Sequence, residues 1–405
     1  IRYLIVTGVQ TCASSDLTRI SGNLLHYDFS LLPQYLEVLF AKLRIAVVFG
    51  GSGDREGSVI YTTHNPRSWK SYEIVAREIA NALEEIGFKQ VFVMPDDMNL
   101  PEKLQRENIH LVWLNTGGVQ GYNPVCHTPA LLEMLGMPYV GHNPLNSSTL
   151  DNKHAFKREL QSVGIKTAPF MIWHPSQGIL RPNLHERFAI AFDEYQGPFI
   201  VKPVSGRASL HVHFVDKIEG LSQAVSEVHR ATHNTALIEK YLPGREFCVA
   251  VCGYVTHTKG CFYKNPKPFA FSTVERVLES DELIFTSMDK KAITADRGKL
   301  MGAEEPQLKQ ELIDLARKIY WEFSLNSLVR IDVRSDANGE LYVLEANPKP
   351  DLKRPTENVT SLVALGLAEY GMSYNDLIFS LLADRLDYLL TQHIGIIPHI
   401  AALLH

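Results

Sequence analysis

The fold of this chain is decided by the stretch Arg330-Ile-Asp332-Val-Arg-Ser-Asp-Ala-Asn338-Gly339-Glu-Leu-Tyr-Val-Leu-Glu345-Ala-Asn347-Pro. Asn338-Gly339 predicts a two-residue hairpin turn. Counting outward from this turn pairs Asp332 with Glu345 and Arg330 with Asn347. Because side chains alternate along a strand, these four residues share one face. The opposite face is expected to carry four apolar side chains, Ile331, Val333, Leu344 and Ala346.

The shared polar face predicts a cation site. Directly opposed side chains lie roughly 5 Å apart, and two carboxylates at that distance repel each other unless positive charge lies between them. Carboxylate and amide oxygens beside an arginine suit Mg²⁺ that holds phosphates. The alternative is a solvated polar face on an ordinary hairpin.

Arg-x-Asp, a short hairpin and Glu-x-Asn together resemble the metal-binding end of the ATP-grasp ligases. From about Lys42 to about Leu390 the chain resembles the D-alanine–D-alanine ligase branch of that superfamily. The resemblance implies α/β and α+β structure, in a three-domain ATP-grasp fold with an N-terminal Rossmann-like (pre-ATP-grasp) domain. The implied reaction has two steps. ATP phosphorylates a carboxylate to an acyl phosphate, and an amine then attacks to form a peptide-type bond, as in peptidoglycan biosynthesis.

The same resemblance implies residue roles. Asp332, Glu345 and Asn347 would hold two Mg²⁺ ions, for which Mn²⁺ could substitute. Arg330 would act in catalysis by stabilising the developing oxyanion.

Bulk properties narrow the class of protein. The chain has 405 residues, a net charge of −5, 45% apolar and 21% charged residues, which fits a soluble globular protein and gives no sign of nucleic-acid binding. No run reaches the roughly 18 apolar residues that a membrane span needs. Five cysteines without a Cys-x-x-Cys pair predict reduced thiols and a cytoplasmic protein. Expected partners are amino-acid or small-peptide substrates, and a homodimer is compatible with the resemblance.

The organisation along the chain follows from hydrophobic runs and the resemblance. Leu43–Phe49 predicts a buried parallel strand, and Ser71–Ile86 has helical spacing, so a doubly wound domain is expected. We expect a Rossmann-like domain over 42–147, a small central domain over 148–240, a large domain over 241–392 and a tail over 393–405. Residues 1–41 are interpreted as a non-native or disordered extension, because Val6–Ala13 looks like a translated sequencing adapter. Deleting residues 1–40 should then leave stability unchanged.

Several residues are candidates for nucleotide binding. Lys202 lies in an apolar strand, where a buried lysine needs an anionic partner such as phosphate, or it reaches solvent at the strand end. The resemblance assigns the following residues to ATP: Lys153, Lys202 and Lys290 (or its neighbour Lys291) to phosphates, Glu239, Lys240 and Leu242 to an adenine hinge, and Glu246 to ribose. Without it, Lys153 would be read as part of a solvated helix face and Glu246 as an exposed strand residue.

The substrate side departs from the family pattern. The phosphate-covering flap keeps Ser209, and Asp54 stands where the family has a glutamate for its first substrate. Both are expected to act in catalysis. Asn115–His127 replaces the first-substrate loop. Asp351 replaces a glycine near the second site, and Lys353 and Arg354 add two cations there, unless Asp351 simply pairs with them at the surface.

Three functions therefore stay open. The first is a ligase of D-alanine–D-alanine ligase type, although these departures predict weak activity with D-alanine alone. The second is a ligase for other amino acids or small peptides. The third is a nucleotide-binding regulatory protein without ligase turnover.

Overall fold

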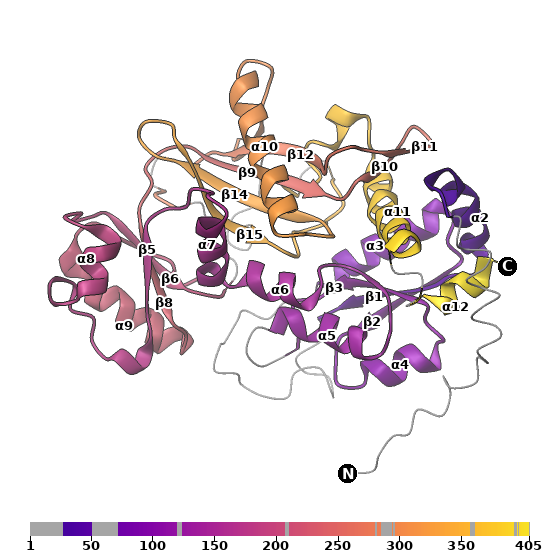
Figure 1. The fold of residues 1–405 in the computed structure, drawn as a ribbon, viewed down its shortest axis with the longest axis horizontal. Helices are drawn as coiled ribbons and strands as arrows, with labels where there is room; N and C mark the ends of the chain where they lie inside the picture. The colour runs from indigo at the N-terminus through magenta and orange to yellow at the C-terminus, as the bar shows by residue number, and fades with distance from the viewer. Residues whose placement is uncertain are drawn as a thin grey trace, which may run out of the picture.

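A computed structural model describes residues 27–50, 72–119, 124–206, 210–279, 282–284, 294, 296–356, 361–392, 395 and 397–404. Three sheets follow one another along the chain and are arranged side by side with helices between and around them (Figure 1). None of the described helices is both long and apolar enough to cross a membrane.

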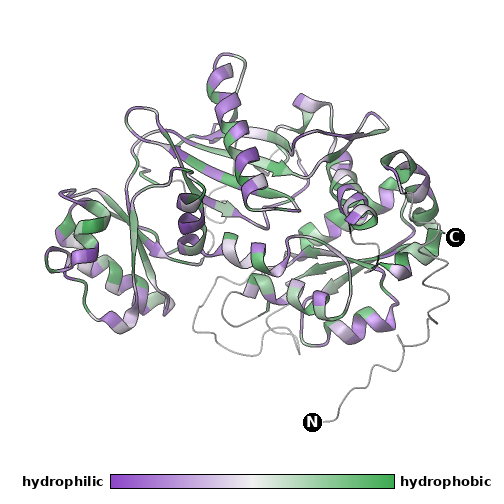
Figure 2. Ribbon diagram, in the orientation of Figure 1, coloured by the Kyte–Doolittle hydropathy of each residue, from purple (hydrophilic) through white to green (hydrophobic). Residues whose placement is uncertain are grey.

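The first sheet is parallel, in the order β2-β1-β3-β4. Its strands are β1 (Arg44–Phe49), β2 (Gln90–Pro95), β3 (Leu111–Asn115) and β4 (Tyr139–Val140). Its helices are α3 (Glu73–Ile86), α4 (Leu100–Arg106), α5 (His127–Met134) and α6 (Pro144–Asp151). Alternate residues of β1 pack in two different apolar clusters, one with α3 and one with α4 and α5. Burial on both faces explains why β1 is a continuous apolar run, and Figure 2 shows this hydrophobic colouring along the strands.

The second sheet is antiparallel, in the order β5-β8-β6-β7. Its strands are β5 (Phe170–Trp173), β8 (Ala236–Lys240), β6 (Phe199–Pro203) and β7 (His213–Val215). Helices α8 (Glu186–Phe192) and α9 (Leu221–Thr232) cover one face and form its apolar core. The other face carries Lys202 and Glu239 and meets α7 (Lys153–Ser162), which is markedly hydrophilic in Figure 2.

The third sheet is antiparallel, in the order β13-β12-β9-β14-β15. Its strands are β13 (Gly298–Leu300), β12 (Phe269–Arg276), β9 (Glu246–Cys252), β14 (Val329–Ser335) and β15 (Leu341–Asn347). Helix α10 (Pro306–Glu322) packs on its outer face together with Phe156 and Leu160 of α7. A small hairpin, β10 (Val255–Thr258) and β11 (Cys261–Lys264), packs against α11 (Tyr374–Gln392), which joins the core of the first sheet.

Short helical segments complete the description. They are η2 (Pro124–Cys126), η3 (Pro175–Gln177), η4 (Pro182–Leu184), η5 (Ile218–Gly220), η6 (Leu367–Tyr370), α12 (Pro398–Ala401) and η8 (Ala402–Leu404).

The β14–β15 hairpin keeps the predicted pairing at the site but not at the turn. Arg330 pairs with Asn347, and Asp332 with Glu345. The predicted two-residue turn is wrong: the Asp336 amide donates to the Glu340 carbonyl, so three residues connect the strands, and Gly339 is left-handed at φ +84°. Beyond Asp332 the pairing shifts by one residue, so that Val333 pairs with Val343 and Leu344 has no partner in the register. As a result, Val343 rather than Leu344 joins the core with Ile331, Val333 and Ala346.

Residues 29–41 are ordered, so the expectation of a disordered extension does not hold for them. Residues Phe29–Leu31 (η1) and Leu32–Lys42 (α2) are helical, and Leu32, Leu36 and Leu39 are buried in the same cluster as α3 and α11. The Tyr27 hydroxyl donates to Asp387 of α11 at 2.8 Å. Residues 1–26, including the adapter-like stretch, lie outside the described residues.

Leu36→Ala tests this packing. Leu36 is 1% exposed, so its truncation is expected to lower the free energy of unfolding by about 2–5 kcal/mol. Val38→Ala is the control, because Val38 lies on the same helix and is 36% exposed. Equal denaturation midpoints for the two variants would show that α2 does not belong to the folded core.

Candidate active site

The centre of the candidate site is the polar face of β14 and β15. Asp332 is 1% exposed and is held by two arginines. Arg330 donates to it from Nε at 2.8 Å and from Nη2 at 2.9 Å, and Arg276 donates from Nη1 at 3.0 Å. The buried carboxylate of Asp332 therefore already has two cationic partners, which offset the cost of burying its charge.

A second set of charges extends across β12, β9 and β14. Arg276 contacts Glu246 at 2.5 Å, from Nη2 to Oε1, and Arg334 Nη1 lies 3.2 Å from Glu246 Oε2. Glu246, the candidate ribose ligand, is thus buried among cations rather than exposed on a strand. The sequence analysis missed Arg276 and Arg334. Arg334 alternates with apolar residues along β14, whereas Arg276 follows Glu275 at the end of β12. The two arginines converge only because β9 pairs with both strands.

Glu345, opposite Asp332, is paired with the candidate phosphate residue Lys153. Lys153 Nζ lies 3.1 Å from Glu345 Oε2 and also donates to the Gly206 carbonyl at 3.2 Å. Burial opposes ionisation of Glu345, but Lys153, Lys202 and Arg330 outweigh it and lower its pKa to about 2. The surrounding cations therefore favour the anionic form of Glu345.

Two further lysines enclose Glu239 at the end of β8. Its carboxylate lies 3.0 Å from Lys157 Nζ and also pairs with Lys202. All three side chains are buried. Burial disfavours the charged form, but the two lysines hold the pKa of Glu239 below its ordinary value. The buried Lys202 thus has the anionic partner that the sequence required, although that partner is a carboxylate. Lys157 had no assigned role, and its one-turn spacing from Lys153 was the available signal.

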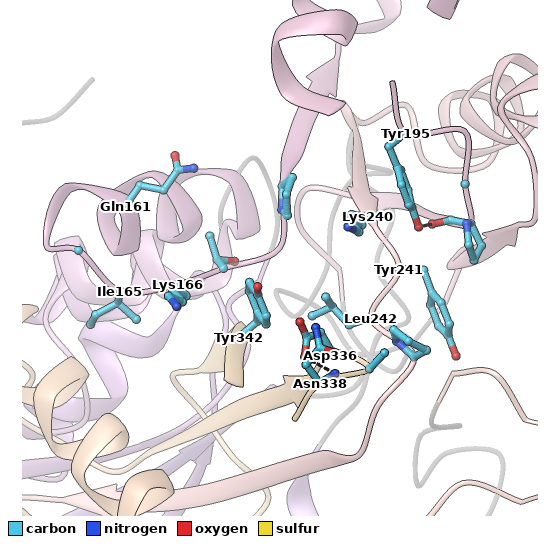
Figure 3. Close-up of a pocket in the computed structure, with 17 residues that line it drawn as sticks. Gln161, Ile165, Lys166, Tyr195, Lys240, Tyr241, Leu242, Asp336, Asn338 and Tyr342 are labelled. Atoms are coloured by element: carbon cyan, nitrogen blue, oxygen red, sulfur yellow. Dashed lines mark hydrogen bonds between the residues drawn. The ribbon is translucent and has the colours of Figure 1, made fainter. Parts of the chain in front are cut away.

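A cavity of about 870 Å³ lies at the hinge between the second and third sheets. Lys240, Tyr241 and Leu242 line it, and Figure 3 shows Tyr195 on one side and Asp336 of the hairpin turn on the other. Two backbone hydrogen bonds hold the hinge, residues 239–242, in place at the end of β8. The Lys240 amide donates to the Pro169 carbonyl at 2.9 Å, and the Tyr241 amide donates to the Pro198 carbonyl at 3.0 Å. The cavity is lined by the hinge and the hairpin turn but not by the charged candidates Lys153, Lys202, Glu239 and Glu246.

The donor set of the hairpin fits a hard divalent cation. Asp332 and Glu345 offer carboxylate oxygens and Asn347 an amide oxygen, which at present accepts the Lys349 amide at 3.2 Å. Within the part of the chain that the structure describes, no three His, Cys, Asp or Glu side chains form a self-contained metal site. Two carboxylates and one amide suit Mg²⁺ that takes its remaining ligands from phosphates and water.

Comparison with known proteins decides the family. Residues 160–383, more than half of the chain, match the family model described as "D-ala D-ala ligase C-terminus". The chain belongs to this ligase family. Its curated relatives include an uncharacterized protein, y4sG, of Sinorhizobium fredii, 28% identical over 84% of this chain and 96% of that protein. A D-alanine–D-alanine ligase of Pseudomonas entomophila is 27% identical over 84% of this chain and 92% of that protein.

The fold comparison agrees with the family. The crystal structure of a D-alanine–D-alanine ligase from Bacillus anthracis complexed with ATP has a TM-score of 0.62 at 19% identity, covering 85% of this chain and 98% of that one. The expected ATP-grasp fold of the D-alanine–D-alanine ligase family is therefore confirmed.

Three predicted site residues, Asp54, Ser209 and Lys290, lie outside the described residues, as does Lys291. The flap is described only as far as Gly206 on its N-terminal side. Nothing in the geometry therefore bears on their roles in this member of the ligase family.

The predicted substrate cation Arg354 has other side-chain partners in this structure. Arg354 binds Glu85 of α3 through Nη1 at 2.9 Å and Asn375 through Nη2 at 2.7 Å. Its side chain therefore links α3 to α11. Asp351 accepts the Lys353 amide at 3.2 Å, a local turn contact.

The carboxyl ends of the strands in the first sheet form a further place where a ligand could bind. Strand order reverses between β1 and β3, where ligands bind in such sheets. Buried Asp96 accepts hydrogen bonds from Thr116 at 2.6 Å and Thr128 at 2.7 Å. Thr116 lies inside the expected substrate loop Asn115–His127 and Thr128 directly follows it, so this one carboxylate ties both ends of the loop to β2.

Proposed function

We propose that this chain is an ATP-dependent carboxylate–amine ligase that forms a peptide-type bond. The observation that carries the proposal is the pairing of Asp332 with Glu345 on one strand face surrounded by Arg330, Arg276 and Lys153. A hairpin with a merely solvated polar face would not bury Asp332 or gather cations from two other elements, β12 and α7. The match to this chain covers nearly the full length of relatives named D-alanine–D-alanine ligases.

We assign ATP to the space between the second and third sheets. The base would lie at the hinge, read by backbone groups of Lys240 and Leu242 and by Glu239. Glu246 would accept the ribose hydroxyls. Lys153 and Lys202 would neutralise phosphates by exchanging their present carboxylate partners, Glu345 and Glu239, for phosphate oxygen. Lys290 would add a third positive charge at the phosphates.

Asp332, Glu345 and Asn347 would hold Mg²⁺, which when bound would neutralise phosphate charge. The chain's own part in the reaction is placement and charge. A substrate carboxylate oxygen attacks the γ-phosphorus and ADP leaves. The amine then attacks the acyl carbon, and inorganic phosphate leaves with one oxygen of the original carboxylate. Arg330, beside the metal ligands, would stabilise the oxyanion of the tetrahedral intermediate.

Ser209 and Asp54 complete the proposal. Ser209 would close the flap on the phosphates, and Asp54 would take the place of the first-substrate glutamate near the carboxyl end of β1. These two roles come from the family pattern alone.

Substrate choice gives the test of function. Because Asn115–His127 and Asp351 differ from the family pattern, we expect weak phosphate release with D-alanine alone and faster release with a larger or charged acceptor. The measurement is Mg²⁺- and ATP-dependent phosphate release over a panel of paired D- and L-amino acids and dipeptides, with product mass determined.

The outcomes separate the candidate functions. D-Alanine dimer formation faster than every other pair would make the chain an ordinary D-alanine–D-alanine ligase. Nucleotide binding without stimulation by any amine would favour a regulatory nucleotide-binding protein and would remove the ligase proposal.

A further inference from the structure

Arg276 connects two parts of the candidate site that have different tasks. It is 9% exposed and contacts the candidate ribose ligand Glu246 at 2.5 Å and the candidate metal ligand Asp332 at 3.0 Å. Arg276 lies on β12, whereas these partners lie on β9 and β14. To reach Asp332 its side chain extends past Cys248, a small buried residue that pairs with Asp332 on the strand between them.

This contact needs both the length and the fork of arginine. Two strand spacings are about 9.6 Å, and a guanidinium can bind two carboxylates at once through different nitrogens. A lysine has a single charged nitrogen and would hold one of the two carboxylates at a time.

We propose that Arg276 is a positioning residue that makes metal binding depend on nucleotide. Without nucleotide, it holds Asp332 together with Arg330, so an entering divalent cation meets two guanidinium groups. Three carboxylates, Glu246, Asp332 and Glu345, then face four cations, Lys153, Arg276, Arg330 and Arg334. The negative charge of a triphosphate reverses this balance, draws Arg276 and Lys153 toward phosphate and frees Asp332 for the metal.

The inference rests on the proposed role of Asp332 as a metal ligand, but it concerns the order of binding. Metal alone should bind weakly, and metal with nucleotide should bind strongly. Removing Arg276 should strengthen the binding of metal alone.

Mn²⁺ binding followed by electron paramagnetic resonance tests this directly, with and without a non-hydrolysable ATP analogue. For the wild-type protein we expect the analogue to tighten Mn²⁺ binding at least about tenfold. Without the analogue, Arg276→Gln should bind Mn²⁺ about tenfold more tightly than wild type. The analogue should then tighten Mn²⁺ binding by the variant much less than it does for wild type. Arg276→Lys should fall between them, and it serves as the test if the glutamine variant does not fold.

Arg245→Gln is the matched control. Arg245 precedes Glu246 and is also held by two carboxylates, Glu275 and Glu305, at 2.8 and 2.6 Å, but it is exposed and away from the metal ligands. It should bind Mn²⁺ as wild type does. Unchanged Mn²⁺ affinity in folded Arg276 variants would overturn this inference but would leave the proposed metal site standing. No Mn²⁺ binding by wild type even with the analogue would overturn the proposed metal site and the inference with it.

Discussion

Glu345→Gln is expected to lower ATP turnover roughly a thousandfold or more while the fold survives. The substitution keeps the shape of the side chain but removes one of the two anionic ligands proposed for Mg²⁺. Metal charge stabilisation is worth several kcal/mol in transition states, and each 1.36 kcal/mol is about a factor of ten in rate. The measurement is the steady-state rate of phosphate release with the best substrate pair.

The stability of this variant should change by less than about 1 kcal/mol. Repulsion between Asp332 and Glu345 is already balanced by Arg330, Arg276 and Lys153, so the relief of repulsion that the sequence alone suggests is not expected. The Lys153–Glu345 pair that is lost involves a side chain 34% exposed, and such pairs contribute little.

Glu340→Gln is the control for turnover. Glu340 lies on the same hairpin, is exposed and pairs with Lys166 away from the polar face. It should retain wild-type activity. Wild-type turnover in Glu345→Gln itself would remove the claim that this face holds the metal.

Glu239→Gln is expected to destabilise the protein by about 3–5 kcal/mol. Glu239 is 3% exposed and neutralises both Lys157 and Lys202. Breaking a buried ion pair by removing one partner leaves the other charges uncompensated. Here two buried ammonium groups would be left facing a neutral amide.

The loss of unfolding free energy caused by Glu239→Gln should shrink as pH rises from 7 toward 9. Without Glu239, burial lowers the pKa values of Lys157 and Lys202 in the folded state below their unfolded values. A lysine with a lowered folded pKa destabilises fully below that pKa and progressively less as pH approaches the unfolded value. Urea denaturation at two pH values gives the comparison.

Glu159→Gln controls for a charge change on α7, because Glu159 lies on the exposed side of that helix. Its unfolding free energy should match wild type within about 0.5 kcal/mol. A Glu239→Gln protein as stable as this control would mean that the lysines are solvated rather than buried around Glu239.

The hairpin shows how far sequence reasoning reaches. The pairing of Asp332 with Glu345 was predicted from a turn of the wrong length, and it holds because the bulge beyond Asp332 compensates for the extra turn residue. Alternation and turn chemistry are local signals, so they constrain the faces of a hairpin well. The bulge has no such local signal. Because of the bulge, Val343 faces the core in place of Leu344, which was the residue predicted there.

Residues that depend on distant contacts were not predictable in this way. Arg276 and Arg334 meet at Glu246 only because β12, β9 and β14 are neighbours in the third sheet. Helix α2 is a different case, because the four-, three- and four-residue spacing of Leu32, Leu36, Leu39 and Leu43 is a helical signal.

The most direct test of the central claim follows oxygen from substrate to phosphate. With the substrate pair that gives the fastest phosphate release, the carboxylate of the donor is labelled with oxygen-18 and the released inorganic phosphate is examined by mass spectrometry. The proposed acyl phosphate transfers one labelled oxygen to each phosphate released. Unlabelled phosphate accompanying the formation of a peptide-type product would contradict an acyl phosphate and with it the proposed ligase chemistry.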